Sequence, residues 1–290
     1  MPSTLSDTRE LPLKTAQDEQ ELKREAWDVR KVLLQALSSR GLRRLVLPFV
    51  AVGIILIVWE IGVRANDIPF YILPAPSAIY QSLEKDVSSL IMWGNLYVTA
   101  KETLLGFVFG ALLGFVIGIF LAEFPIIDDT FYPLIVAFQS MPKVAIAPLL
   151  LIWFGFGLES KIAIAALLAF FPVLVNTALG LRSTDLRQEE LMHSLAASRW
   201  QVFSMVRFFN ALPSVFAGLE LAMVFSAIGA IVGEFVGARA GLGYMIQQRN
   251  AETDIAGIFA ILFILGVFGA TTTYTVRLLA ARIVFWQQHR

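Results

Sequence analysis

The stretch EELMHSLAASRWQVFSMVRFFNALP, residues 189–213, decides how the rest of the chain is organised. It is polar and charged, and it stands between two long apolar segments, residues 160–181 and 213–236. A charged segment between two membrane spans must lie outside the hydrocarbon, because the bilayer interior offers its polar groups no water. Its apolar residues recur at helical spacing on both sides of a break near 197–199. We expect two short helices joined by a turn, forming either a docking surface or a solvated connector.

The composition is that of an integral membrane protein. Of the 290 residues, 57% are hydrophobic and 16% are charged, and the mean hydropathy is +0.70. The net charge is zero, so no global field recruits nucleic acid. Cysteine is absent, which excludes disulfides, thiolate metal sites and cysteine nucleophiles. The two histidines, His193 and His289, are too few and too far apart to suggest a metal centre.

Six apolar segments are long enough to cross a bilayer, and they predict an all-α membrane fold. They are residues 45–63, 98–122, 131–156, 160–181, 213–236 and 255–286. The first is too long for the core of a cleavable signal peptide and should act as an uncleaved anchor. An amphipathic helix over residues 76–92 is expected along the interface before the second span.

The distribution of basic residues predicts the topology. Nine of the 23 Lys and Arg lie in residues 1–44, which also contain a predicted amphipathic helix over 17–37. Positive charge favours the cytoplasmic side, so we place this tail there. Six spans then put the loop 182–212 and the C-terminal end, residues 287–290, on the same side. Residues 45–286 form the membrane domain.

The loop resembles the cytoplasmic EAA loop of membrane subunits of binding-protein-dependent ABC importers. The matching positions are Glu190 for Glu, Leu191 and Met192 for the two Ala, Ala196 for Gly, and Val206, Phe208 and Phe209 for the final Ile, Leu and Pro. A Gly at a helix end usually supplies a left-handed turn, and a Pro fixes the backbone. Ala196 and Phe209 are expected to supply neither, so the sequence leaves the geometry of the turn open.

Further motifs resemble, in order, the permeases for nitrate, sulfonate, taurine, bicarbonate and related organic solutes. They are LPAPSAIYQSL (73–83), SMPKVAIAPLLLIWFGFG (140–157), FFPVLVNTALGLRSTD (170–185), LAASRWQ (195–201), LPSVFAGLELA (212–222) and GARAGLGYMI (237–246). The resemblance covers residues 45–286. It implies the permease fold of a type I ABC importer, with about six transmembrane helices, in the bacterial inner membrane.

The chain has no Gly-rich phosphate loop of the P-loop kind, so it is not expected to be an enzyme or to hold a cofactor. The resemblance implies that ATP and Mg²⁺ bind to two cytoplasmic ATPase subunits. It also implies a second permease copy or a paralogue, and a periplasmic solute-binding protein, with membrane lipid around the spans. Closure of the ATPases would push the loop helices as a lever and reorient the spans.

Seven loop residues are candidates for contact with the ATPase: Glu190, Ser194, Leu195, Ala196, Ala197, Arg199 and Trp200. An aromatic residue such as Trp200 on a polar loop is a typical anchor at protein interfaces. Alternatively, Trp200 rests at the membrane boundary, where Trp is enriched. Arg199 is expected to contact either the ATPase or lipid phosphates.

Polar groups and prolines inside the apolar segments are candidates for the translocation path, because polar groups are costly there. The candidates are Gln139, Met141, Pro142, Lys143, Phe171, Pro172, Asn176, Glu220, Met223 and Glu234. Pro142 and Pro172 are expected to break the hydrogen-bond ladder of spans three and four. Ordinary helix packing is the competing interpretation of the Phe and Met candidates. Similar proteins more often carry Arg at the position of Glu220. This carboxylate could pair with a basic residue on this or a partner subunit, line the path, or lie in water at the cytoplasmic end. We favour the last two over proton coupling.

Two further features concern packing. Gly106, Gly110, Gly114 and Gly118 form a small-xxx-small ridge that predicts a tight helix contact. Glu234 and residues 237–246 are expected to form a re-entrant cap at the outer side, the alternative being a flexible loop.

The predicted function is the permease subunit of an ATP-driven importer. Its solute would be a small anion such as nitrate, a sulfonate or taurine, bicarbonate or an organic acid, with thiamine-precursor pyrimidines and aromatic acids as alternatives. An ion-gradient-driven transporter would need paired intramembrane charges and two similar halves, and the sequence indicates neither. A membrane enzyme would need clustered acids or a nucleophile with its base. A membrane sensor on the same scaffold is a further alternative.

Overall fold

The computed structural model describes residues 40–286, and all regular structure in this range is helical. The chain divides into two compact units at residue 66. The described part of the first unit is α2 (Arg40–Ala65), whose stretch Val46–Ala65 is long and apolar enough to cross a membrane. The predicted tail helix over 17–37 and the end at 287–290 lie outside the described residues.

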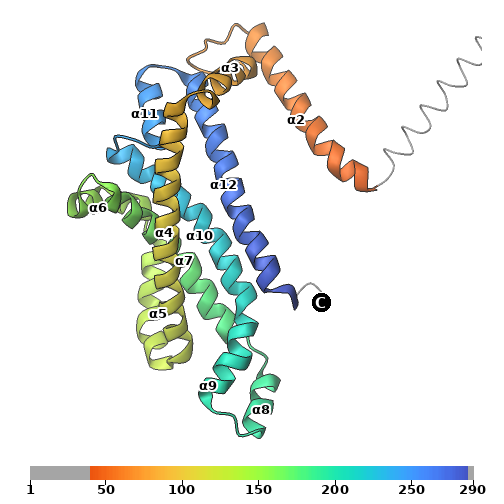
Figure 1. Ribbon diagram of the computed structural model, residues 1–290, viewed down its shortest axis with the longest axis vertical. Helices are drawn as coiled ribbons and strands as arrows, with labels where there is room; N and C mark the ends of the chain where they lie inside the picture. The colour runs from red at the N-terminus through yellow and green to blue at the C-terminus, as the bar shows by residue number, and fades with distance from the viewer. Residues whose placement is uncertain (1–39, 287–290) are drawn as a thin grey trace, which may run out of the picture. The chain divides into compact units, whose positions relative to one another are not determined.

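The second unit contains the remaining helices, and the predicted interfacial helix is present in it as α3. In chain order they are α3 (Pro76–Val87), α4 (Leu90–Glu123), α5 (Pro125–Ser140), the 3₁₀ turn η1 (Lys143–Ile146), α6 (Ala147–Phe154), α7 (Leu158–Arg182), α8 (Leu186–Ser194), α9 (Arg199–Val202), the π-helical turn η2 (Phe203–Arg207), α10 (Phe208–Gly237), α11 (Leu242–Ala251) and α12 (Ile255–Ile283). Figure 1 shows α8 and α9 at one end of this unit, called here the loop end, and α3 and α11 at the other, called the cap end.

The prediction of about six spans is confirmed, with two corrections to their shape. Among residues 40–286, five helical stretches can cross a membrane, and a sixth arises if α5 and the η1–α6 segment count as one span. That span is not straight, because the chain bends by 87° between Ser140 and Lys143. The fifth span does not begin at 213, because α9, η2 and α10 form one helix of 39 residues from Arg199 to Gly237.

The two prolines expected to break the hydrogen-bond ladder have different effects on their helices. Pro142 does interrupt its span, because proline has no backbone N–H and pushes the preceding residue out of the helical region. Met141 accordingly has extended backbone angles, with φ −73° and ψ 142°. Pro172 lies inside the continuous helix α7, so it removes one hydrogen bond of the ladder without ending the helix. One missing hydrogen bond there is tolerated within a helix of 25 residues.

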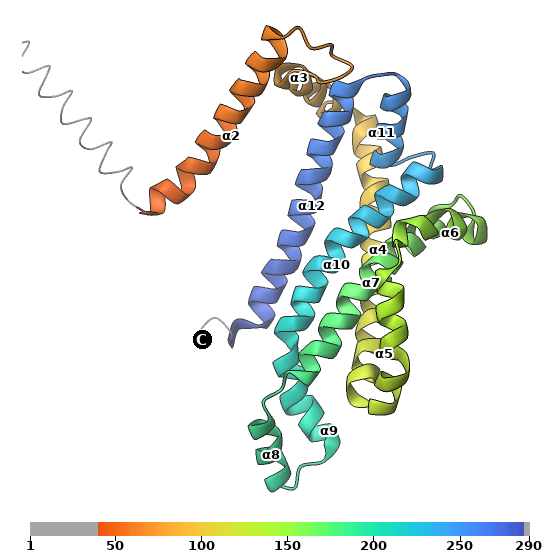
Figure 2. The ribbon, with the colours of Figure 1, turned by 180° about the vertical axis from the view of Figure 1, so that it is seen from behind.

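Helix α7 lies at the centre of the second unit and packs against both α4 and α10, and Figure 2 shows α7 and α10 running side by side. The glycine ridge of α4 makes the predicted tight contact. A Cβ atom at Gly114 would lie 2.5 Å from the carbonyl oxygen of Phe170, and one at Gly118 would lie 2.8 Å from that of Leu174. On the other side, a Cβ atom at Gly218 of α10 would lie 2.9 Å from the carbonyl oxygen of Pro172. The helix backbones therefore touch.

The cap end is packed rather than loose. Leu242 and Met245 of α11 form a buried cluster with Met92 of α4 and Ile261 of α12. The segment 237–246 is therefore a turn leading into a docked helix, and the flexible-loop alternative is wrong.

Candidate functional site

A cavity of about 260 Å³ lies beside the bend between α5 and α6. Its wall is formed by Gln139, Lys143, Val144, Leu168, Phe171, Pro172, Phe225 and Ile228. Four of the predicted path residues, Gln139, Lys143, Phe171 and Pro172, thus meet at one place. Phe171 and Pro172 stand near the middle of α7, so the cavity lies at mid-depth of this span.

Among the residues that the structure describes, Lys143 is the only charged one in this wall. Its ammonium nitrogen lies 4.8 Å from the centre of the Phe171 ring and donates a hydrogen bond of 3.0 Å to the carbonyl oxygen of Gln139. A cation over an aromatic face is stabilised by the ring quadrupole. Within residues 40–286, no carboxylate forms an ion pair with this ammonium group. The arrangement can offer positive charge to a bound group.

The remaining path candidates lie elsewhere. Pro142 forms the bend, and Met141 beside it is exposed. Asn176 donates to the carbonyl oxygen of Pro172 at 2.8 Å, within its own helix. Met223 is buried in α10. The sequence did not identify Leu168, Val144, Phe225 or Ile228 as part of the cavity wall, because apolar residues in a span carry no distinguishing signal.

Glu220 forms an ion pair with Arg277 of α12, at 3.0 Å between Oε2 and Nη2. Both residues line a second cavity of about 570 Å³ between α10 and α12. Pairing with a basic residue of the same chain was one of the options that the sequence left open for Glu220, and the structure shows this pair.

Glu234 belongs to a buried polar cluster near the cap end. It is 1% exposed and accepts hydrogen bonds from the Thr99 hydroxyl, at 2.6 Å, and from the backbone N–H of Gly243. Nearby, the buried ammonium of Lys161 donates to three carbonyl oxygens at 2.6–3.1 Å, one of them on Gly237 of α10. These bonds join α4, α7, α10 and α11. Charged residues inside apolar segments are the sequence signal that could have indicated this cluster.

The turn between α8 and α9 is well defined, although the sequence left it open. Ala196 has φ +57°, the left-handed conformation of the Gly that the resemblance places there, so the expectation that Ala196 would not supply this turn is wrong. Ala197 N–H donates to Met192 at 3.0 Å and Ala196 N–H to His193 at 2.9 Å, which is the Schellman pattern of a helix C-terminus. Ser198 and Gln201 then form a reciprocal capping box at the start of α9.

This turn displays an apolar face on a charged loop. Leu191, Leu195 and Trp200 are 61%, 70% and 72% exposed. The Trp200 ring stacks on Phe203 with 5.6 Å between centroids, which fixes its orientation. Of the other coupling candidates, Glu190, Ser194, Ala196 and Arg199 are exposed and Ala197 is half-buried. The geometry gathers the candidates at the loop end.

Ion pairs tie the loop to the spans. Arg207, in the π-helical turn, contacts Glu123 at the end of α4 at 2.7 Å and Glu189 in α8 at 3.3 Å. Arg182 at the end of α7 contacts Asp128 of α5. The sequence interpretation listed these arginines only for topology, because partners so distant in the chain cannot be identified by spacing.

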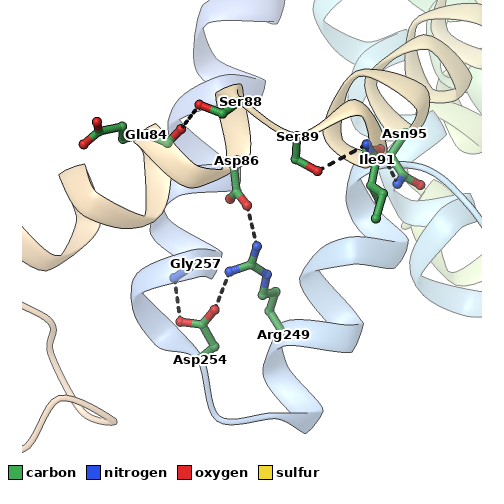
Figure 3. Close-up of polar contacts among 9 residues, drawn as sticks. All are labelled: Glu84, Asp86, Ser88, Ser89, Ile91, Asn95, Arg249, Asp254 and Gly257. Carbon is green, nitrogen blue, oxygen red and sulfur yellow. Dashed lines mark hydrogen bonds and ion pairs between the residues drawn. The ribbon is translucent and has the colours of Figure 1, made fainter.

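At the cap end, Arg249 of α11 holds two aspartates, one from α3 and one preceding α12 (Figure 3). Burial raises the pKa of Asp86, which is 4% exposed, and outweighs the opposing effect of Arg249. Burial also acts to raise the pKa of Asp254. Hydrogen bonds from the Gly257 N–H, at 2.9 Å, and from Arg249 outweigh it and lower that pKa. The triad joins three helices.

Comparison with known proteins identifies the family. The profile described as "Binding-protein-dependent transport system inner membrane component" matches residues 114–285. The formylaminopyrimidine transport permease protein ThiX of Halalkalibacterium halodurans is 34% identical over 234 residues, 81% of this chain and 93% of that protein. The riboflavin transport system permease protein RibX of Chloroflexus aurantiacus is 33% identical over 238 residues, 82% and 89% of the two chains.

The fold has a counterpart among solved structures. A chain in inward-facing conformations of the MetNI methionine ABC transporter superposes with a TM-score of 0.55 at 20% identity, over 67% of this chain and 96% of that one. At this identity the likeness concerns the fold alone. Taken with the profile and the two relatives, it places the sequence among multi-pass membrane permeases. The chain therefore belongs to the family of binding-protein-dependent transport system inner membrane components, the permease subunits of ABC importers.

Proposed function

We propose that this chain is the membrane subunit of an ATP-driven importer in a bacterial inner membrane, with the loop end and both termini in the cytoplasm. Members of the family are transport subunits, not enzymes, and work with an ATPase and a binding protein. In this proposal two ATPase subunits dock on the loop end, a second permease copy or paralogue completes the path, and a periplasmic protein delivers a small solute.

The observation that carries the proposal is the exposed apolar face of the α8–α9 turn. Leu191, Leu195 and Trp200 project from a charged loop, held by a Schellman motif and a capping box. Large apolar side chains gathered on a polar segment favour a protein partner, and a stacked tryptophan is a typical anchor. Glu190, exposed on the same turn, adds a charge for pairing.

The solute in this proposal is a small anion that passes the cavity beside Lys143. Lys143 brings a positive charge to the wall of this cavity, and the bend at Pro142 interrupts a candidate span. Backbone groups freed within a span persist only inside protein or beside water. The resemblance suggests nitrate, a sulfonate, taurine, bicarbonate or an organic acid. ThiX and RibX, by name, transport ring-bearing solutes.

The test is a mild-detergent pull-down of the tagged chain from its native cell, followed by mass spectrometry. We expect recovery of a P-loop ATPase and a solute-binding protein. The double variant Glu190→Lys with Trp200→Ala should lose most of the ATPase, because it removes the anchor and reverses the charge. A matched control, Glu252→Lys with Tyr80→Ala, changes an exposed acid and an exposed aromatic outside the loop end. Undiminished ATPase recovery with the loop variant would contradict the docking proposal.

A further inference from the structure

Among its described residues, the cavity at the α5–α6 bend carries one positive charge on a mostly apolar wall. Lys143 contributes the ammonium group, and Gln139 contributes an amide. The rest of the wall consists of two phenylalanines, a proline and three aliphatic residues. This is the chemistry of a site that holds a charged end and an apolar body together.

We infer that this cavity selects monovalent organic anions with an apolar or aromatic body, such as aryl or alkyl sulfonates and carboxylates, over small hydrated inorganic anions. The inference rests on the proposed function and narrows its solute class. It names Lys143 as the group that binds the anionic end, and Phe171 and Phe225 as the walls that contact the body.

The charge balance favours an anion. The wall has a cation and, among its described residues, no acidic side chain. Lys143 uses one N–H on the Gln139 carbonyl oxygen, which leaves further donors, since an ammonium group has three. A sulfonate or carboxylate oxygen can accept these in a charge-assisted hydrogen bond.

The size and lining favour an organic body. An apolar cavity of about 150 Å³ suffices to hold benzene, and this one measures about 260 Å³. A ring with one anionic substituent therefore fits. Nitrate or bicarbonate could pair with Lys143 but would not contact the Phe and aliphatic side chains of the wall. The loss of the anion's hydration water would then be poorly compensated by contacts in the cavity.

The position in the helices supports a binding role. Lys143 is the first residue after the break at Met141–Pro142, and its ammonium group lies over the Phe171 ring, so the break and the α7 wall are in contact. A broken span at mid-depth beside a lone cation is the kind of place where transport proteins bind solute. Gln139 and Val144 are exposed, so the cavity is accessible from the surface of this chain.

The experiment uses the permease–ATPase complex recovered with the tagged chain, freed of the solute-binding protein and placed in nanodiscs, with radiolabelled benzenesulfonate as the probe. We expect saturable binding that unlabelled hexanesulfonate displaces and that equal nitrate or bicarbonate does not. Lys143→Gln should weaken probe binding about ten- to a hundredfold, because it removes a charge-assisted bond. Lys143→Arg should retain most of it, and Lys101→Gln, at an exposed lysine of α4 outside the cavity wall, should not change it.

A thermal unfolding curve for each variant separates lost binding from lost folding. Equal competition by nitrate, or unchanged probe binding by folded Lys143→Gln, would overturn the inference. The same preparation tests the proposed function separately, because its ATPase content is measured directly. If no ATPase accompanies the chain, the importer assignment fails whatever the binding result. If the ATPase is present and Lys143→Gln binds normally, only the solute class fails.

Discussion

At the scale of single residues, Ala196 shows how a backbone position can override side-chain preference. It adopts the left-handed conformation that costs an L-residue roughly 1–2 kcal/mol. Two Schellman hydrogen bonds and the adjoining capping box hold it there. The strain is local to the turn that carries the proposed docking face, so it can be relieved without altering that face.

We therefore expect Ala196→Gly to stabilise the turn by up to about 1 kcal/mol, since glycine enters this conformation freely while adding some entropy to the unfolded chain. Ala197→Gly is the matched control, because Ala197 is not among the positive-φ residues of the described chain, and it should be neutral or destabilising. Limited proteolysis of the loop would measure both. Faster cleavage of Ala196→Gly than of the parent would contradict the expectation.

The two aspartates bound to Arg249 should contribute to stability with opposite dependences on pH. The pKa of Asp254 is lowered on folding, so its contribution is complete above the ordinary aspartate pKa of about 3.9 and is lost as pH falls through the folded value. We expect Asp254→Asn to cost about 1 kcal/mol at neutral pH, allowing for solvent screening of this half-exposed group, and less in acid.

Asp86 has a raised pKa, so its contribution is complete below the ordinary aspartate pKa and is lost as pH rises through the folded value. The deficit of Asp86→Asn relative to the parent should therefore shrink from acid toward neutral pH. Thermal unfolding of both variants across the same pH series would check the pair. Parallel pH profiles would contradict the assignment of opposite shifts.

At the scale of helices, the glycine ridge of α4 sets the distance to α7. A Cβ atom at Gly110 would collide with the carbonyl oxygen of Ala166, whereas one at Gly94 in the same helix would meet nothing within 4 Å. Gly110→Ala should destabilise the protein by about 1–3 kcal/mol through overpacking. Gly94→Ala should be neutral or stabilising by up to about 1 kcal/mol from helix propensity. Thermal unfolding in detergent compares them, and equal effects would contradict backbone contact at the ridge.

Arg207 links three helical elements at the loop end, since it contacts Glu189 of α8 and Glu123 of α4 from the turn that leads into α10. In the proposed importer it is a positioning residue that carries movement of the loop into the spans. We expect Arg207→Gln to retain ATPase binding and hydrolysis but to lower solute uptake per ATP several-fold. Arg187→Gln, at an exposed arginine of α8, is the control. Equal loss of hydrolysis and uptake would indicate failed docking instead.

At the scale of the whole molecule, the proposed orientation places the loop end and the cap end on opposite sides of the membrane. The absence of cysteine gives a clean background for labelling. Single cysteines at exposed positions, Arg187→Cys at the loop end and Glu252→Cys at the cap end, should react with a membrane-impermeant maleimide from opposite sides. In intact cells only the second should be labelled. Labelling of Arg187→Cys from outside would reverse the topology.

The sequence predicted the spans and the loop because length, hydropathy and charge are local properties. It predicted Gln139, Lys143, Phe171 and Pro172 as path residues because polar groups and prolines are conspicuous in apolar segments, and the structure gathers these four around one cavity. It did not predict the 87° bend or the joining of the loop helix to the fifth span. A proline in the sequence does not reveal which effect it has: Pro142 ends a helix, whereas Pro213 lies inside the continuous helix α10. Pairs such as Glu220 with Arg277 depend on tertiary packing that no spacing rule encodes.

The continuous helix from Arg199 to Gly237 has a mechanical consequence. Its backbone approaches that of α7 at several points along this length, at Gly218 against Pro172 and again at Gly229 against Ala165. At 1.5 Å per residue the whole helix is about 58 Å long, so it reaches from the loop end to the level of the cap end. Because the two backbones touch repeatedly, a displacement at Trp200 would carry α7 along with it. Movement of the loop would therefore reach Glu234 as a joint shift of the two paired helices.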